Sequence, residues 1–169
     1  VIKSPIGRGL FLKEPQSIFS EALAKVLAIR REYKKRMLAL APDTADYKAA
    51  YAMDYAHKVF ANAFYGVVGG DFSRYYLKDV AENITLSGQM ALGFIRDQLE
   101  AKGYKVVMGD TDSVGFISPG ATPEIAEVLA QELTEAAIRM FEEKSGVRSS
   151  LFDLEVQRIC SSMFIPVAE

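Results

Sequence analysis

A hairpin of two β-strands is predicted from the stretch YKVVMGDTDSVGFI, residues 104–117. Two short apolar runs, residues 104–108 and 114–117, flank a polar turn that contains Asp110 and Asp112. Short runs rich in β-branched and aromatic residues on either side of turn residues are typical of paired strands. Carboxylates this close repel each other, and a bound divalent cation offsets that cost. The stretch therefore predicts a metal site at the turn, and such a site suggests phosphate chemistry.

Two other interpretations of this turn stay open. Asp and Ser are common turn residues, so the polar run can be a turn without a ligand. The same run, residues 109–113, is also similar to one acidic loop of haloacid-dehalogenase-type phosphatases. The phosphatase interpretation predicts metal-dependent hydrolysis of small phosphoesters.

Four helices are predicted outside the hairpin, because apolar residues recur there at spacings of three and four. Their expected ranges are about 15–40, 45–66, 77–101 and 122–144. The first ends near Pro42, and the short connection makes the first two helices antiparallel neighbours. The tail, residues 151–167, is rich in β-formers and is predicted as one or two strands. The expected fold class is α+β, with a long antiparallel helical hairpin attached to packed helices and a small antiparallel sheet.

Composition indicates an ordinary globular chain, since half of the 169 residues are hydrophobic and a quarter are charged. No apolar run approaches the roughly 20 residues that span a bilayer, so no membrane is expected. The net charge of −2 does not by itself indicate nucleic-acid binding. Residues 1–36, however, contain nine basic and only three acidic residues. This segment suggests an element that faces an anion, and a solvated helix end is the alternative.

The second predicted helix carries Lys58, Asn62 and Gly66 at spacings of four, so the three share one stripe of its surface. A cation suits a phosphate, an amide gives a directional hydrogen bond, and glycine lets a flat group approach closely. Tyr65, beside this stripe, offers a ring that can stack on a base or sugar. The alternative is an amphipathic helix with a solvated lysine and a glycine at its end.

The first predicted helix contributes Arg30 and Lys34, which are also four residues apart. In an antiparallel pair these two cations lie within reach of the Lys58 stripe. Three cations and an amide between two helices would make a cradle for a triphosphate. The alternative for both residues is ordinary surface charge.

Two motifs in this order closely resemble signature motifs of the family B DNA polymerases. KxxxNxxYG, residues 58–66, resembles the motif of the fingers helix, and residues 109–113 resemble the metal motif of the palm. Residues 30–37 are similar to the basic first helix of the fingers, and residues 152–155 to the strand that follows the palm helix. The resemblance extends over nearly the whole chain.

The resemblance implies three parts: residues 1–14 would connect palm to fingers, 15–70 would be the fingers hairpin, and 71–169 a partial palm. The implied function is template-directed DNA synthesis, the transfer of a nucleotide from a dNTP to a primer 3′-hydroxyl with two Mg²⁺ ions. Asp112 would be the principal metal ligand and Asp110 a supporting acid.

The implied nucleotide site lies on the two fingers helices. Arg30, Lys34 and Lys58 would grip the triphosphate, and Asn62 would orient it. Lys58 would also be the candidate to protonate the leaving pyrophosphate. Tyr65-Gly66 would lie against the nascent base pair. Implied partners are primer–template DNA, a dNTP and the remainder of the polymerase, with its exonuclease, rest of the palm and thumb.

Several departures from the family pattern lead us to expect a fragment. Met108 and Gly109 stand where the family has a tyrosine, and Ala63 stands where serine is common. No Asp-x-x-Ser-Leu-Tyr-Pro motif occurs, so one acidic metal ligand is missing from this chain. We therefore expect the chain to be inactive alone. The expected location is intracellular, in cytoplasm, nucleoid or nucleus, and an inactive DNA- or nucleotide-binding remnant of a polymerase is the alternative function.

Overall fold

The computed structural model describes residues 1–148 and 152–163. In chain order, its elements are β1 (Ile2–Lys3), β2 (Leu10–Phe11), α1 (Ile18–Leu38), α2 (Ala45–Gly69), α3 (Lys78–Ala101), β3 (Lys105–Asp110), β4 (Ser113–Ile117) and α4 (Pro123–Ser145). The fold is mostly helical with two small antiparallel two-stranded sheets, which confirms the expected class. No helix in the described ranges has both the length and the apolar character that a membrane crossing requires.

The chain divides into two compact units, and the boundary between them falls within α3. The first unit comprises Val1 and Gly9–Ile84, and the second comprises Ile2–Arg8 and the chain from Thr85 onward. Each unit carries part of the predicted site. The division into parts at residues 14 and 70 stays a prediction.

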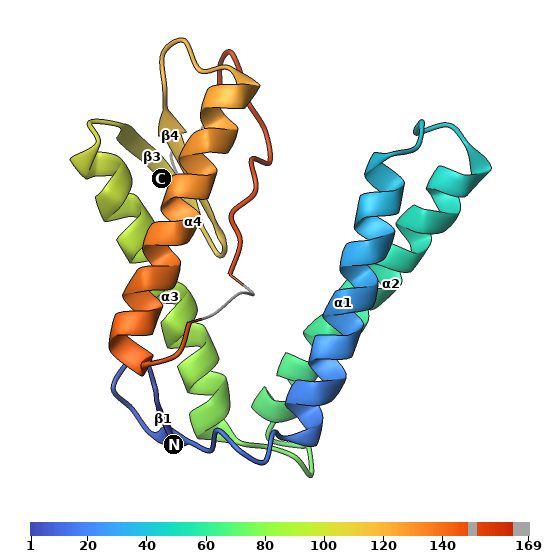
Figure 1. The fold of residues 1–169 in the computed structure, drawn as a ribbon, viewed down its shortest axis with the longest axis vertical. Helices are drawn as coiled ribbons and strands as arrows, with labels where there is room; N and C mark the ends of the chain where they lie inside the picture. The colour runs from blue at the N-terminus through green and yellow to red at the C-terminus, as the bar shows by residue number, and fades with distance from the viewer. Residues whose placement is uncertain (149–151, 164–169) are drawn as a thin grey trace, which may run out of the picture. The chain divides into compact units, whose positions relative to one another are not determined.

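The first unit is built on a pair of antiparallel helices, α1 and α2 (Figure 1). Ser17 caps α1 by accepting a hydrogen bond from the Ser20 N–H, and Thr44 caps α2 by accepting one from the Tyr47 N–H. The start of α1 meets the end of α2, since the Phe19 and Phe64 rings are 6.1 Å apart. The predicted helical hairpin is therefore present.

Burial within this helix pair is shallow. α1 has no buried residue, and Ala50 and Val68 are the buried residues of α2. Aromatic rings contact each other at the base of the pair, where the ring centroids of Phe19 and Tyr75 are 5.3 Å apart in an edge-to-face arrangement. The pair is thus held by side-chain contacts along its seam and not by a deep core.

α2 runs further than predicted. Gly66 lies inside the helix, which ends at Gly69 with Gly70 as its cap. The Gly70 N–H donates to the Gly66 carbonyl at 2.9 Å. Gly66 is therefore not needed to end the helix, and its lack of a side chain requires another reason.

The second unit contains the predicted strand hairpin. β3 and β4 pair antiparallel, with Lys105 opposite Ile117 and Asp110 opposite Ser113. A bulge between Val106 and Met108 shifts the register by one residue, and such bulges are frequent next to functional sites. The loop that joins the strands contains only two residues, which places Asp110 and Asp112 at the tip.

The core of the second unit lies beneath this hairpin. Its buried members come from α3 and α4 at spacings of four and are Ile95, Leu99, Leu129, Leu133 and Ala137. Val106, Val114 and Phe116 of the hairpin pack on this cluster. The base of the hairpin is thus anchored on apolar side chains, which fixes the position of its polar tip.

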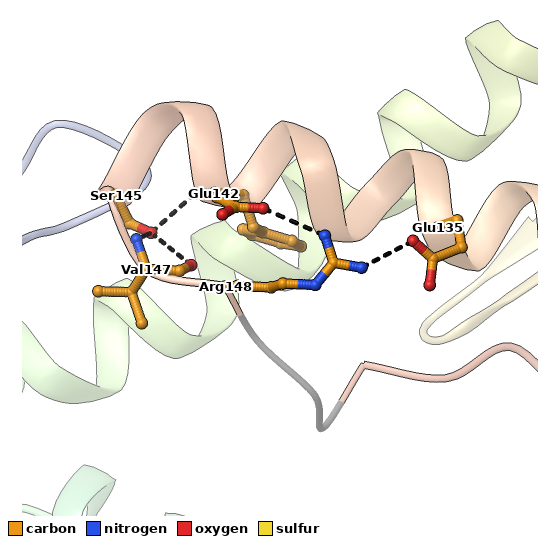
Figure 2. A network of polar contacts seen from close by, with 6 residues as sticks. Glu135, Glu142, Ser145, Val147 and Arg148 are labelled. Atoms are coloured by element: carbon orange, nitrogen blue, oxygen red, sulfur yellow. Dashed lines mark hydrogen bonds and ion pairs between the residues drawn. The ribbon is translucent and has the colours of Figure 1, made fainter.

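α4 has well-defined ends. Thr122 caps its start, with Pro123 in the first turn, and Gly146 ends it with a left-handed φ of 74°. Arg148, just beyond the helix, donates to Glu135 Oε2 at 2.9 Å and to Glu142 Oε2 at 3.2 Å. Figure 2 shows this network of contacts along α4. These contacts hold the first residues after α4 against the helix surface.

The prediction of strands in the tail is wrong for residues 152–163, which contain no strand. The remainder of the predicted range lies outside the described residues. A strand needs a hydrogen-bonded neighbour, and here the Leu154 N–H donates instead to Thr134 Oγ1 on α4 at 3.1 Å. The Phe152 ring lies 5.9 Å from that of Phe141. Phe152 and Leu154 therefore pack against the helical core, whereas Val156, Ile159 and Met163 are exposed.

Candidate functional site

The hairpin tip places both predicted metal ligands in solvent. Asp110 is the last residue of β3, Asp112 lies in the turn, and both are exposed. Between them Thr111 has a φ of 47°, a left-handed conformation that a β-branched residue rarely adopts. Such a conformation costs about 1–3 kcal/mol and is found preferentially at functional sites. The strain at Thr111 is a feature that the sequence did not reveal.

Short-range hydrogen bonds stabilise this turn. Thr111 Oγ1 donates to Asp110 Oδ1 at 2.9 Å, and Ser113 Oγ donates to the Asp110 carbonyl at 3.1 Å. The Asp112 N–H also donates to the Asp110 carbonyl. These contacts fix the backbone that separates the two carboxylates.

The residues of the tip fit a magnesium site in part. Carboxylate oxygens are the ligands that Mg²⁺ prefers, and it usually takes only one or two of them from a protein. Within residues 1–148 and 152–163, no group of three Asp, Glu, His or Cys residues is placed to hold a metal ion. The hairpin therefore offers two ligands of the right type, and a two-metal site would require others.

On the helix pair, Arg30 reaches across from α1 to α2. Its Nε donates to Asp54 Oδ1 at 3.2 Å. The side chains of Arg30 and Asp54 are 31% and 14% exposed, so the pair is partly shielded from water. The structure thus brings one predicted cation to the seam between the helices, beside an acid that sequence reasoning did not assign to the site.

The spacing of the chain contained a signal for this pair. The connection between α1 and α2 is short, so residues equally far from its centre lie opposite each other in the antiparallel pair. Arg30 therefore lies opposite residues near position 54. A second contact supports this register, because the Phe19 ring of α1 meets the Phe64 ring of α2 with centroids 6.1 Å apart. Asp54 was therefore predictable as a partner of Arg30.

The other predicted nucleotide ligands share these faces by helical spacing. Lys34 is half-buried one turn after Arg30, and Lys58 is exposed one turn after Asp54. Asn62, exposed, follows Lys58 by a further turn. Helical spacing thus gives a row of polar groups along α2, and Arg30 is the α1 cation whose contact with that helix is observed.

The end of this row is open to solvent. Tyr65 is 48% exposed. A Cβ built on Gly66 would meet no atom within 4 Å, so packing within the chain does not require glycine at this position. A flat group approaching the helix from outside would benefit from the missing side chain.

Comparison with known proteins identifies relatives of this chain. The sequence profile of DNA polymerase family B matches residues 9–144. The DNA polymerase of Archaeoglobus fulgidus is 33% identical over 125 residues, which are 74% of this chain and 16% of that protein. DNA polymerase 2 of Aeropyrum pernix is 30% identical over 159 residues, which are 94% of this chain and 18% of that protein.

A solved structure has a similar fold. It is that of the family B DNA polymerase from the hyperthermophilic archaeon Pyrobaculum calidifontis, which matches with a TM-score of 0.64 and 29% sequence identity. The match covers 80% of this chain and 17% of that chain. The present chain therefore spans a small part of the length of each of these polymerases.

Proposed function

Because this chain belongs to DNA polymerase family B, we propose that it takes part in template-directed DNA synthesis and provides the nucleotide grip and part of the metal site. The reaction is attack of a primer 3′-hydroxyl on the α-phosphate of a dNTP, with pyrophosphate as the leaving group. The bond formed is the new phosphodiester, and the bond broken joins the α- and β-phosphates. The setting for such a reaction is intracellular.

The helix pair would hold the triphosphate. Arg30 would bind phosphate oxygens in a fixed geometry, while Lys34 and Lys58 would add charge. Asn62 would orient the nucleotide, and Lys58 would be placed to donate a proton to the departing pyrophosphate. Catalysis of this kind depends on positioning and on charge stabilisation.

The hairpin tip would supply acidic ligands. Asp112 and Asp110 would hold Mg²⁺ together with ligands from outside the described residues. Bound Mg²⁺ would neutralise charge that develops on the phosphates and lower the pKa of the primer hydroxyl. The strained turn at Thr111 would set the backbone between the two carboxylates.

A single observation carries the proposal. The stripe from Lys58 to Gly66 and the paired aspartates at 110 and 112 both lie inside residues 9–144, which match the family profile. A phosphatase would use only the two aspartates, and this interpretation does not explain the polar residues on the helix pair. An inactive remnant would not need to retain Arg30, Lys34 and Lys58.

Primer extension by a chimera tests the proposal. Residues 9–144 would replace the matching segment of the Archaeoglobus fulgidus DNA polymerase, and extension would be followed with Mg²⁺ and all four dNTPs. We expect extension by the chimera and its loss by about a hundredfold or more in the Asp112→Asn variant. Asp97→Asn, an exposed acid on α3, is the matched control and keeps extension at the level of the unchanged chimera.

The alternatives predict other outcomes in the same assay. A folded chimera that binds DNA and dNTP without extending the primer would indicate the inactive remnant. Unchanged primer extension by the Asp112→Asn variant would show that Asp112 is not the proposed metal ligand. Hydrolysis of p-nitrophenyl phosphate by the 169-residue chain would indicate the phosphatase.

A further inference from the structure

Resting on the proposed function, we infer that Asp54 is a positioning residue for the triphosphate: it holds the Arg30 guanidinium in the orientation that binds phosphate. The inference starts from the Nε to Oδ1 contact of 3.2 Å between α1 and α2. This contact occupies the guanidinium N–H nearest the stem of the side chain. The terminal Nη1 and Nη2 groups are the fork that binds an oxyanion.

An acid at this place requires an explanation. In the proposed nucleotide site, Arg30, Lys34 and Lys58 would together attract an anion, and a carboxylate beside Arg30 would weaken that attraction. The Asp54 side chain is only 14% exposed, so its charge is less screened than that of a surface residue. Asp54 therefore opposes anion binding by charge, and a net benefit has to come from the order it imposes on Arg30.

Fixing the Arg30 side chain before the ligand arrives would favour phosphate binding. An arginine side chain loses considerable rotamer freedom when it binds phosphate, and a ligand site that is ordered in advance avoids this loss on binding. A hydrogen bond at Nε fixes the plane of the guanidinium and the reach of its stem. The Tyr33–His57 stack supports the same stretch of the helix seam.

The two possible roles of Asp54 predict opposite signs. If Asp54 acts only through its charge, Asp54→Asn binds a triphosphate more tightly, because one negative charge is gone. If it positions Arg30, Asp54→Asn binds more weakly despite its gain in net positive charge. Glu32→Gln is the matched control, since Glu32 is an exposed acid of α1 and the change in charge is the same.

The experiment measures the affinity of the 169-residue chain for inorganic tripolyphosphate and for dATP by calorimetry, with circular dichroism as the check of folding. We expect Asp54→Asn to weaken binding of both about tenfold, the effect of losing one charge-assisted hydrogen bond. Glu32→Gln leaves the affinity unchanged or tightens it. In the Arg30→Gln background, Asp54→Asn should no longer weaken binding and, like Glu32→Gln, should leave the affinity unchanged or tighten it, because only the charge of Asp54 is then lost.

Each other outcome counts against the inference. Binding by Asp54→Asn that equals that of Glu32→Gln overturns it, and so does a loss that persists without Arg30. If Asp54→Asn fails to fold, Asp54→Glu replaces it; this variant keeps the charge, moves the carboxylate by one methylene, and is expected to lose affinity as well. If Asp54→Glu binds with the affinity of the wild-type chain, the positioning role of Asp54 is also refuted. A wild-type chain that binds neither probe would refute the proposed nucleotide grip itself, together with this inference.

Discussion

At Gly66, the fold does not require glycine, whereas the proposed function does. It lies inside α2, where glycine is less favourable than alanine, and an added Cβ would meet no atom of the chain. Gly66→Ala should therefore stabilise the 169-residue chain by about 1 kcal/mol, measured by thermal or urea unfolding. In the chimera, the same change should reduce nucleotide incorporation roughly tenfold, because the methyl group occupies space that the nascent base pair needs.

A matched variant distinguishes these two effects. Gly88 lies in α3, and a Cβ added there also meets nothing within 4 Å. Gly88→Ala should give a similar gain in stability with unchanged incorporation. Equal incorporation by the two variants would show that the surface at Gly66 does not approach the substrate.

The shared helix face of the candidate residues was predictable, whereas backbone conformation at the hairpin tip was not. Lys58, Asn62 and Gly66 lie on one face from spacing alone, since residues four apart share a helix face whatever the tertiary structure, and their roles in binding stay predictions. The left-handed Thr111 carries no such signal, because threonine normally avoids positive φ. It arises from the tight two-residue loop, which is a property of the closed hairpin.

At the scale of elements, the cap of α4 links a side chain to a titration. The Thr122 hydroxyl accepts the Ile125 N–H, and its hydrogen bond to Glu124 lowers the pKa of that carboxyl below its ordinary value. Thr122→Ala should destabilise the chain by about 1 kcal/mol at pH 7, as is usual for loss of a helix cap. Thr122→Ser keeps the hydroxyl and should retain the stability of the parent.

The pH dependence of this effect has a definite sign. A carboxyl whose pKa is lowered in the folded state stabilises the fold above its ordinary pKa, and the contribution is lost as pH falls through the lowered value. The stability difference between the parent and Thr122→Ala should therefore shrink as the pH is lowered through that range. NMR titration of Glu124 should show its pKa closer to the ordinary value in Thr122→Ala, and an unchanged pKa would contradict the assigned cause.

Elements with a strong local pattern were predicted well, and those that depend on distant partners were not. The four helices begin and end close to their expected positions, because periodicity and caps such as Thr44 and Thr122 are local. The prediction for the tail was wrong, because β-forming residues become a strand only where a neighbouring strand is available for backbone hydrogen bonding. The bulge at Val106–Met108 is also set by pairing and left no mark in the sequence.

At the scale of the whole molecule, burial is distributed unevenly between the two units. The buried cluster of Ile95, Leu99, Leu129, Leu133 and Ala137 lies entirely in the second unit, and Leu99 is only 1% exposed. α1 contains no buried residue, and α2 contains two. Local opening costs least where the fewest apolar contacts are broken.

Hydrogen exchange followed by mass spectrometry should therefore resolve two levels of protection in the 169-residue chain. Amides of α1 and α2 should exchange first, and those of Thr85–Ala101, β3, β4 and α4 should persist until the second unit opens. Tripolyphosphate should slow exchange around Arg30 and Lys58, because a ligand of the folded helix pair stabilises it by mass action. Arg30→Gln should remove that slowing and leave exchange in α4 unchanged. Uniform protection along the chain would show instead that the thin seam of the helix pair is as stable as the packed core, and that shallow burial here does not set the order of opening.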